Sequence, residues 1–291
     1  MNVTGSTVCF RSLDRLSLTG SRFNEDGAGL RGRFAWVIDG ATGLSNDQLT
    51  SGGSDAAWLA AFIDERLAAL SETEGAYLVL RQLEGDVRSA FGEETAHVQD
   101  VGDHHAPSAC LGLIELMPGD TGLLRLQGHL LGDVVVLVPS EHGIDRWSDE
   151  RAKPFERKTL AALGARGHEP GQIPEAVRRQ ILENRTRLNQ QDGYWVVNPR
   201  RPWAGQELRF DAQVRSDAPI VLATDGFMRL VDVFAAYSDH ELYDRLAAGK
   251  GQDLMQELRE RERGDLMAGA YPRVKTHDDA TFLVIAAERS R

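Results

Sequence analysis

The sequence predicts an α+β protein in which strands and helices form separate layers. Short runs of β-branched and aromatic residues predict strands, and longer segments with a helical period predict helices. Along the chain these predicted elements come in blocks, in the order strands, helices, strands, helices and a last strand. Such blocks are typical of layered α+β proteins rather than of a regularly alternating parallel sheet. Over 291 residues, 42% are hydrophobic and 26% charged, which is enough for a sizeable core. No repeat, low-complexity tract or linker divides the chain, so we expect one domain over 1–291.

The first hundred residues predict two strands and then two helices. The strands are expected at 7–10 and 33–38, and the second ends at the turn dipeptide Asp39-Gly40. Ser54 follows two glycines and is a good N-cap for the first helix. Its apolar residues recur at helical spacing, and a second amphipathic run follows at 77–91. The apolar face of each segment predicts a helix that packs against a hydrophobic core.

The rest of the chain predicts further strands, a basic helical segment and a final strand. Strands are expected at 109–116, 122–126, 130–138, 194–197, 219–223 and 280–286, and helices at 155–163, 174–188, 231–237, 239–248 and 253–263. Residues 145–187 hold ten Lys and Arg against seven Asp and Glu, a local charge of about +3. This segment is either a solvated face or a lobe that attracts an anionic substrate.

Charge and cysteine content exclude several classes of protein. The net charge of −11 repels nucleic acid and anionic membranes, so we expect neither as a partner. The two cysteines, Cys9 and Cys110, exclude a disulfide framework and are interpreted as small buried hydrophobes. No apolar stretch approaches the ~18 residues of a membrane span, and residues 1–18 lack a signal-peptide core. A cytoplasmic location is therefore predicted.

Carboxylates stand at the ends of apolar strands in four places. These are Asn24-Glu25-Asp26, Asp39-Gly40, Asp225-Gly226 and Asp278-Asp279. If they converge, their repulsion requires cations or protons between them. Oxygen ligands favour Mg²⁺ or Mn²⁺ over Zn²⁺, and no histidine–cysteine cluster competes, because His104-His105 is interpreted as loop. The alternative is that each Asp-Gly is only a turn.

Five motifs in order resemble the metal-dependent protein phosphatase family (PPM, type 2C, bacterial type). They are Asn24-Glu25-Asp26, Val37-Ile38-Asp39-Gly40 with Gly43, Leu131-Gly132-Asp133, Thr224-Asp225-Gly226 and Asp278-Asp279-Ala280-Thr281. The resemblance covers about residues 5–288. It implies a four-layer α-β-β-α sandwich with two central antiparallel sheets and a variable flap-like insertion at about 145–190.

The resemblance also implies roles for individual residues around two Mn²⁺ or Mg²⁺ ions and a weak third. Asp39 would bridge the two ions, Asp225 and Asp278 would hold the first, and the Gly40 carbonyl and Glu25 would serve the second. Asp26 would steady metal-bound water. Asp133 matches the carboxylate at the third ion.

The sequence departs from the family pattern at several positions. The phosphate-binding arginine of the family falls on Ser21, and Arg22 lies one place away, so Arg22 is the candidate for the substrate phosphate. Ala41 stands where some members have histidine, and Val134-Val135 replace the polar half of the Gly-Asp motif. Arg229 stands where a second acid often follows. The primary two-ion set is intact and the third site is weakened.

The implied activity is hydrolysis of phosphoserine and phosphothreonine in proteins by a hydroxide that bridges two ions. The chain has no cysteine-based phosphatase loop, which excludes the thiol-nucleophile class. The basic segment would contact the phosphoprotein. Two alternatives stay open: a catalytically weak or inactive phosphatase-like binding protein, and a hydrolase of small phosphate esters. The oligomeric state is not predicted.

Overall fold

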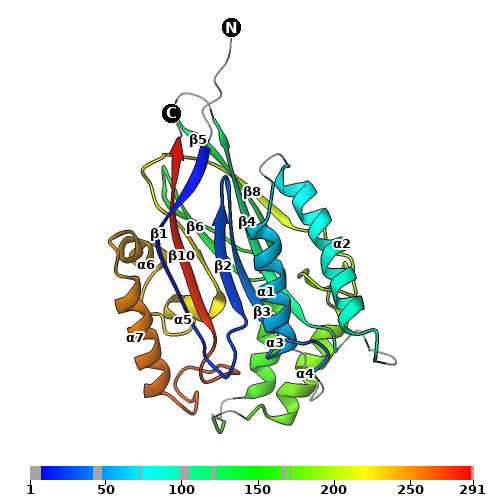
Figure 1. Cartoon of the computed structure of the whole chain (residues 1–291). Coiled ribbons are helices and arrows are strands. Elements are labelled where there is room, and N and C mark those ends of the chain that lie inside the picture. The colour runs from blue at the N-terminus through cyan, green and yellow to red at the C-terminus, as the bar shows by residue number, and fades with distance from the viewer. Residues whose placement is uncertain are drawn as a thin grey trace.

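Two five-stranded antiparallel sheets form the centre of the protein (Figure 1). The computed structural model describes residues 8–41, 48–71, 74–98, 102, 105–119, 122–164, 168–170 and 172–289. The first sheet has the order β1 (Val8–Leu18), β10 (Ala280–Arg289), β9 (Ile220–Ala223), β6 (Val135–Ser140) and β7 (Gly143–Trp147). The second has the order β2 (Asp26–Arg31), β3 (Phe34–Ala41), β4 (Ser108–Pro118), β5 (Leu124–Leu131) and β8 (Leu208–Val214).

Alternation along the strands divides the core into an inner layer and two outer ones. In β10, Leu283 and Ile285 point between the two sheets, whereas Phe282 and Val284 point to the opposite face. The inner layer joins the sheets through buried aliphatic side chains such as Leu126, Val136 and Leu222. Strands that are buried on both faces read as continuous apolar runs, which is why β10 was recognisable in the sequence.

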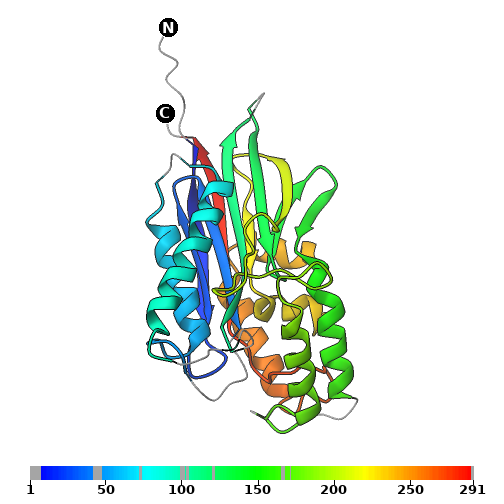
Figure 2. The same ribbon diagram turned by 90° about the vertical axis from the view of Figure 1, so that its right-hand side faces the viewer.

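Helices cover the outer face of each sheet (Figures 1 and 2). On the second sheet lie α1 (Asp55–Ala68) and α2 (Ala76–Glu94), which bury Leu59, Ile63 and Leu83 against it. On the first sheet lie α5 (Asp225–Asp232), α6 (Asp239–Ala247) and α7 (Gly251–Gly264). The arrangement is helices, sheet, sheet, helices. It confirms the α+β class and the four-layer sandwich that the resemblance implied.

A helix pair stands at one end of the sandwich, at the bottom in Figure 1. A short 3₁₀ turn, η1 (Glu150–Ala152), leads into α3 (Lys153–Leu163), and α4 (Glu175–Thr186) follows. Asn184 ties the two helices together, because its amide nitrogen donates to the Thr159 hydroxyl at 2.9 Å and to the Phe155 carbonyl at 3.0 Å. Both helices fall in the segment predicted as a flap-like insertion, and that division of the chain stays a prediction. No helix in the described ranges is long and apolar enough to cross a bilayer.

Several sequence-based elements were correct and others were wrong. Ser54 is the N-cap of α1 and accepts a hydrogen bond from the Ala57 amide. The strand expected at 194–197 is wrong, because those residues form only isolated bridges. The helix expected at 231–237 is also wrong: α5 begins at Asp225, since Phe227 and its apolar neighbours pack on the first sheet. The strands β2, β7 and β8 were not predicted.

Candidate metal centre

Five of the predicted acidic positions come to the same end of the two sheets. In the second sheet, Asp26 of β2 lies opposite Asp39 of β3. In the first sheet, β9 lies between β6 and β10, and Ala223 is opposite both Val135 and Phe282. Asp133 precedes β6, Asp225 follows β9 and Asp278 precedes β10, so this antiparallel order brings all three to one edge. The motifs therefore meet because of strand register, although they are spread over 250 residues of sequence.

Glycine is required beside two of these acids. A Cβ on Gly226 would lie 1.8 Å from the Asp279 carbonyl oxygen, so the chain after Asp225 can approach β10 only without a side chain. Gly132 has φ +75°, and a Cβ there would lie 2.3 Å from the Cys110 sulfur. This kink ends β5, separates it from β6 and turns Asp133 toward the site. The strand predicted over 130–138 is interrupted for this reason.

A pocket of about 250 Å³ opens between these strand ends and the helix pair α3–α4. Its floor holds four of the acids, and its wall is formed by the two helices and the segment that follows them. The lining residues are Asp39, Gly40, Ala41, Ser108, Cys110, Asp133, Ala152, Phe155, Glu156, Thr159, Ile181, Asn184, Arg185, Tyr194, Val196, Asp225, Lys275 and Asp278.

The carboxylates in this pocket repel one another. Burial raises the pKa of Asp39 well above its usual value, and the charges of Asp225, Asp26 and Asp133 raise it further. The pKa of Asp26 is also well above normal, because burial outweighs its hydrogen bond from the Thr224 hydroxyl at 2.8 Å. Asp225 is exposed in part to solvent. Even so, burial of its carboxylate and the charges of Asp133 and Asp278 raise its pKa to about 6. Protons or cations must therefore balance this cluster near neutral pH.

Asp278 is the exception, because two cations neutralise it. The Arg229 guanidinium donates to one carboxylate oxygen at 2.7 Å and the Lys275 ammonium donates to the other at 2.8 Å. Burial alone would raise the pKa of Asp278, but Lys275 and Arg229 hold it below the usual value. Arg229 also pairs with the fully buried Glu262 at 2.8 Å. The sequence singled out Arg229 as a departure from the family pattern, but not its partners.

Asp133 has two neighbours that the sequence analysis missed. The Cys110 thiol donates to Asp133 at 3.1 Å, so this cysteine faces the carboxylates as well as the core. Glu156 of α3 lines the same pocket, and burial together with the Asp133 charge raises the Glu156 pKa to about 8. No sequence motif pointed to Glu156, because a helix from outside the motifs brings it to the site.

The remaining predicted site residues lie around this centre, and two of them do not line the pocket. Glu25 accepts a hydrogen bond from the Ser54 hydroxyl at 2.6 Å, and its backbone carbonyl accepts from the Gly40 amide at 3.0 Å. The Arg22 guanidinium lies over the Phe23 ring, 5.0 Å from its centroid, and is exposed. Glu25 and Arg22 are both absent from the lining of the pocket, and so is Asp26, which lies beside it opposite Asp39. His104 and Gly43 lie outside the described residues.

Solved structures with similar folds come from bacterial phosphatases. The *Mycobacterium tuberculosis* serine/threonine phosphatase PstP/Ppp matches at a TM-score of 0.56 and 15% identity, covering 96% of this chain and 98% of that one. Stp1 from *Staphylococcus aureus* matches at 0.54 and 14%, with 94% of each chain covered. The chain has the fold of bacterial serine/threonine phosphatases.

Two further solved structures have a similar fold. PppA of *Pseudomonas aeruginosa*, a regulatory component of a type VI secretion system, matches this phosphatase fold at a TM-score of 0.56 and 16% identity, covering 97% of this chain and 100% of that one. One structure of the PstP catalytic domain holds two manganese ions; it matches at 0.55 and 15%, covering 97% and 99%. No protein-family model matches the sequence, and no curated protein does. The likeness confirms the fold that the motifs implied.

The donor set of this phosphatase-fold pocket suits a hard divalent cation in its chemical type. Asp39, Asp133, Asp225 and Asp278 offer only oxygen, and their mutual repulsion would be relieved by an ion between them. Within the described ranges, however, no three His, Cys, Asp or Glu side chains are oriented to hold one ion as they stand. Three of the acids in and beside the pocket are turned to other partners: Asp278 to its two cations, Asp26 to Thr224 and Asp133 to Cys110. Metal binding therefore requires these side chains to exchange partners.

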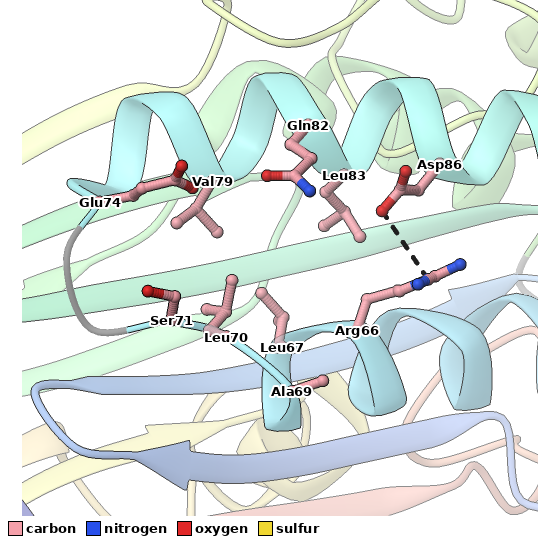
Figure 3. Close-up of a pocket in the computed structure, with 10 residues that line it drawn as sticks. All are labelled: Arg66, Leu67, Ala69, Leu70, Ser71, Glu74, Val79, Gln82, Leu83 and Asp86. Carbon is pink, nitrogen blue, oxygen red and sulfur yellow. Dashed lines mark ion pairs between the residues drawn. The ribbon is translucent and has the colours of Figure 1, made fainter.

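A second cavity, of about 270 Å³, lies between α1 and α2 on the outside of the second sheet (Figure 3). Apolar side chains such as Leu67, Val79 and Leu83 line it, and Arg66 pairs with Asp86 across it at 3.7 Å. Glu74 lies at the other end of the cavity in Figure 3, away from Asp86. This cavity offers no converging carboxylates, so the pocket at the strand ends is the better candidate site.

Proposed function

We propose that this protein is a metal-dependent phosphatase that hydrolyses phosphoserine and phosphothreonine in proteins. The observation that carries the proposal is the convergence of Asp39, Asp133, Asp225 and Asp278 from both sheets into one pocket. A binding surface for a neutral partner has no physical need for acids that repel one another. The fold supports the same activity, because its solved neighbours include serine/threonine phosphatases.

The residues present fit two Mn²⁺ or Mg²⁺ ions. In the proposal, Asp39 would be a ligand of both ions, Asp225 and Asp278 would hold the first, and the Gly40 carbonyl and Glu25 would serve the second. Asp26 would orient bound water, and Asp133 with Glu156 would serve a weak third ion. When bound, such ions lower the pKa of coordinated water and offset the negative charge of a phosphoryl group.

Other residues of the chain would position groups at the site, shield the pocket from water and bind the protein substrate. Asp26 lies opposite Asp39, and the hydrogen bond from the Thr224 hydroxyl fixes the Asp26 carboxylate in this position. Phe155 and Tyr194 close one wall of the pocket, with their ring centroids 5.0 Å apart, and limit the access of bulk water. The basic segment, residues 145–187, would contact the phosphoprotein.

One observation favours a second candidate, a phosphatase-like binding protein with weak or no activity. Arg229 and Lys275 occupy the Asp278 carboxylate and compete with an ion for it. A hydrolase of small phosphate esters is a third candidate, because such substrates would need only the carboxylate centre and not the basic helices.

Calorimetry with Mn²⁺ and hydrolysis of an aryl phosphate test the proposal together. We expect Mn²⁺ binding in the pocket, turnover that depends on Mn²⁺ and loss of both in Asp39→Asn. Mn²⁺ binding without turnover of the aryl phosphate or of a phosphoprotein would favour the binding protein. Turnover of the aryl phosphate alone would favour a hydrolase of small esters. No Mn²⁺ binding would refute the metal-dependent reaction.

A further inference from the structure

One buried arginine in the pocket has no acidic partner among the residues that the structure describes. Three arginines are buried among the described residues: Arg185, Arg229 and Arg273. Arg229 pairs with Glu262 and Asp278, and Arg273 pairs with Asp265 at 2.7 Å. Within the part of the chain that the structure describes, Arg185 pairs with no carboxylate, although it is only 6% exposed. Its charge is left without a counter-ion in a site that is otherwise rich in acids.

Arg185 makes one hydrogen bond to the described part of the chain, which leaves most of its donors unused. One terminal nitrogen donates to the Ala106 carbonyl at 2.7 Å, and the buried Nε has no partner. A guanidinium has five N–H donors, and an unpaired buried charge is costly. Burial accordingly lowers the pKa of Arg185. A ligand that supplied negative oxygens would remove this cost.

Arg185 stands on the opposite side of the pocket from the acids. It comes from the last turn of α4, which Asn184 holds against α3. Tyr194 also lines this pocket. The pocket therefore has an acidic floor, where Lys275 is paired with Asp278, and a helical wall that carries Arg185 together with Glu156.

We propose that Arg185 binds the phosphate group of the substrate, a role for which the sequence pointed to Arg22. The inference rests on the proposed function and assigns it a specific anion anchor. A phosphomonoester suits both sides of this pocket, because two of its oxygens match the fork of a guanidinium while the others face the floor. Arg22 is exposed, stacks on Phe23 and does not line the pocket.

The test compares Arg185→Gln with Arg81→Gln, an exposed arginine of α2 that does not line the pocket. Calorimetry measures the Kd of inorganic phosphate with and without Mn²⁺, and hydrolysis of an aryl phosphate gives KM and kcat. A charge-assisted hydrogen bond contributes about 1.5–3 kcal/mol, so Arg185→Gln should raise the phosphate Kd and KM by about 10- to 100-fold. The Kd of Mn²⁺ should stay within about threefold of wild type. Arg81→Gln should match wild type in every measurement.

The outcomes separate this inference from the proposed function. If wild type neither binds Mn²⁺ nor turns over, the proposed function fails, and loss of metal-free phosphate binding in Arg185→Gln still supports the anchor. An unchanged phosphate Kd in a folded Arg185→Gln, with only a lower Tm, would mean that Arg185 merely holds the Ala106 carbonyl. That result overturns the inference, as does a wild type that binds no phosphate. If Arg185→Gln does not fold, Arg185→Lys replaces it; we expect about tenfold weaker phosphate binding, and wild-type binding would overturn the inference.

Discussion

Arg229→Met should destabilise the metal-free protein by about 3 kcal/mol. Arg229 bridges Glu262 at 2.8 Å and Asp278 at 2.7 Å, and the exposed fractions of the three side chains are 7%, 0% and 17%. Removing one partner of a buried ion pair typically costs about 3–5 kcal/mol, because the other charge stays buried. We expect the lower end, because Glu262 keeps Arg259 at 2.7 Å and Asp278 keeps Lys275 at 2.8 Å. The loss corresponds to a drop in Tm of about 6 °C.

Arg261→Met provides a matched control on α7. Arg261 also pairs with a glutamate, Glu257, at 2.7 Å, but the two side chains are 37% and 30% exposed. Such a pair contributes only about 0.5 kcal/mol. Urea denaturation without divalent ions, monitored by circular dichroism, measures both variants. If the two variants lose the same stability to within about 0.5 kcal/mol, burial does not give the Arg229 bridge its strength and our reasoning is wrong.

Three further predictions concern the carboxylates. Lys275→Ala should tighten Mn²⁺ binding about fivefold in calorimetry. The half-exposed ion pair between Lys275 and Asp278 contributes about 1 kcal/mol, and without it the Asp278 carboxylate is available to the ion. Weaker Mn²⁺ binding would contradict this competition. Asp39→Asn should lower aryl phosphate turnover more than about 100-fold and raise the Tm of the metal-free protein, because a repelling charge is lost; wild-type turnover would contradict a bridging role. The pKa of Asp225 is raised to about 6, so the native state binds more protons than the unfolded chain between about pH 4 and 6. Wild type without metal should therefore lose stability relative to Asp225→Asn as the pH rises through this window, and the difference in Tm between pH 4.5 and 7.5 checks the sign.

Much of the acidic floor was predictable from the sequence because strand ends mark it. A carboxylate directly after or before an apolar run, as at Asp39 or Asp225, fixes its place at a sheet edge once the strands pair. The sequence could not show what closes the pocket. Glu156 and Arg185 come from amphipathic helices whose orientation depends on how α3 and α4 pack, and the spacing of residues in one helix does not determine that.

The elements that the sequence missed have a common physical cause. In β8, every second residue from Arg209 to Gln213 is exposed, and charged residues interrupt the apolar pattern. In β2, two glycines replace the β-branched residues that indicate a strand. Their pairing partners β5 and β3 hold these strands in place, so tertiary contacts rather than local propensity form them.

The division of the acids between two sheets has a mechanical consequence. Asp39 lies in β3 of one sheet, whereas Asp225 and Asp278 flank β9 and β10 of the other, and among the described residues no ladder of backbone hydrogen bonds joins the two sheets. A sliding motion between the sheets would change the spacing across the carboxylate set without breaking any strand pairing. The interdigitated aliphatic side chains between the sheets resist that motion. The packed apolar side chains between the sheets therefore set the distance between Asp39 and the carboxylates of the other sheet. The geometry of the site thus depends on residues that do not take part in it.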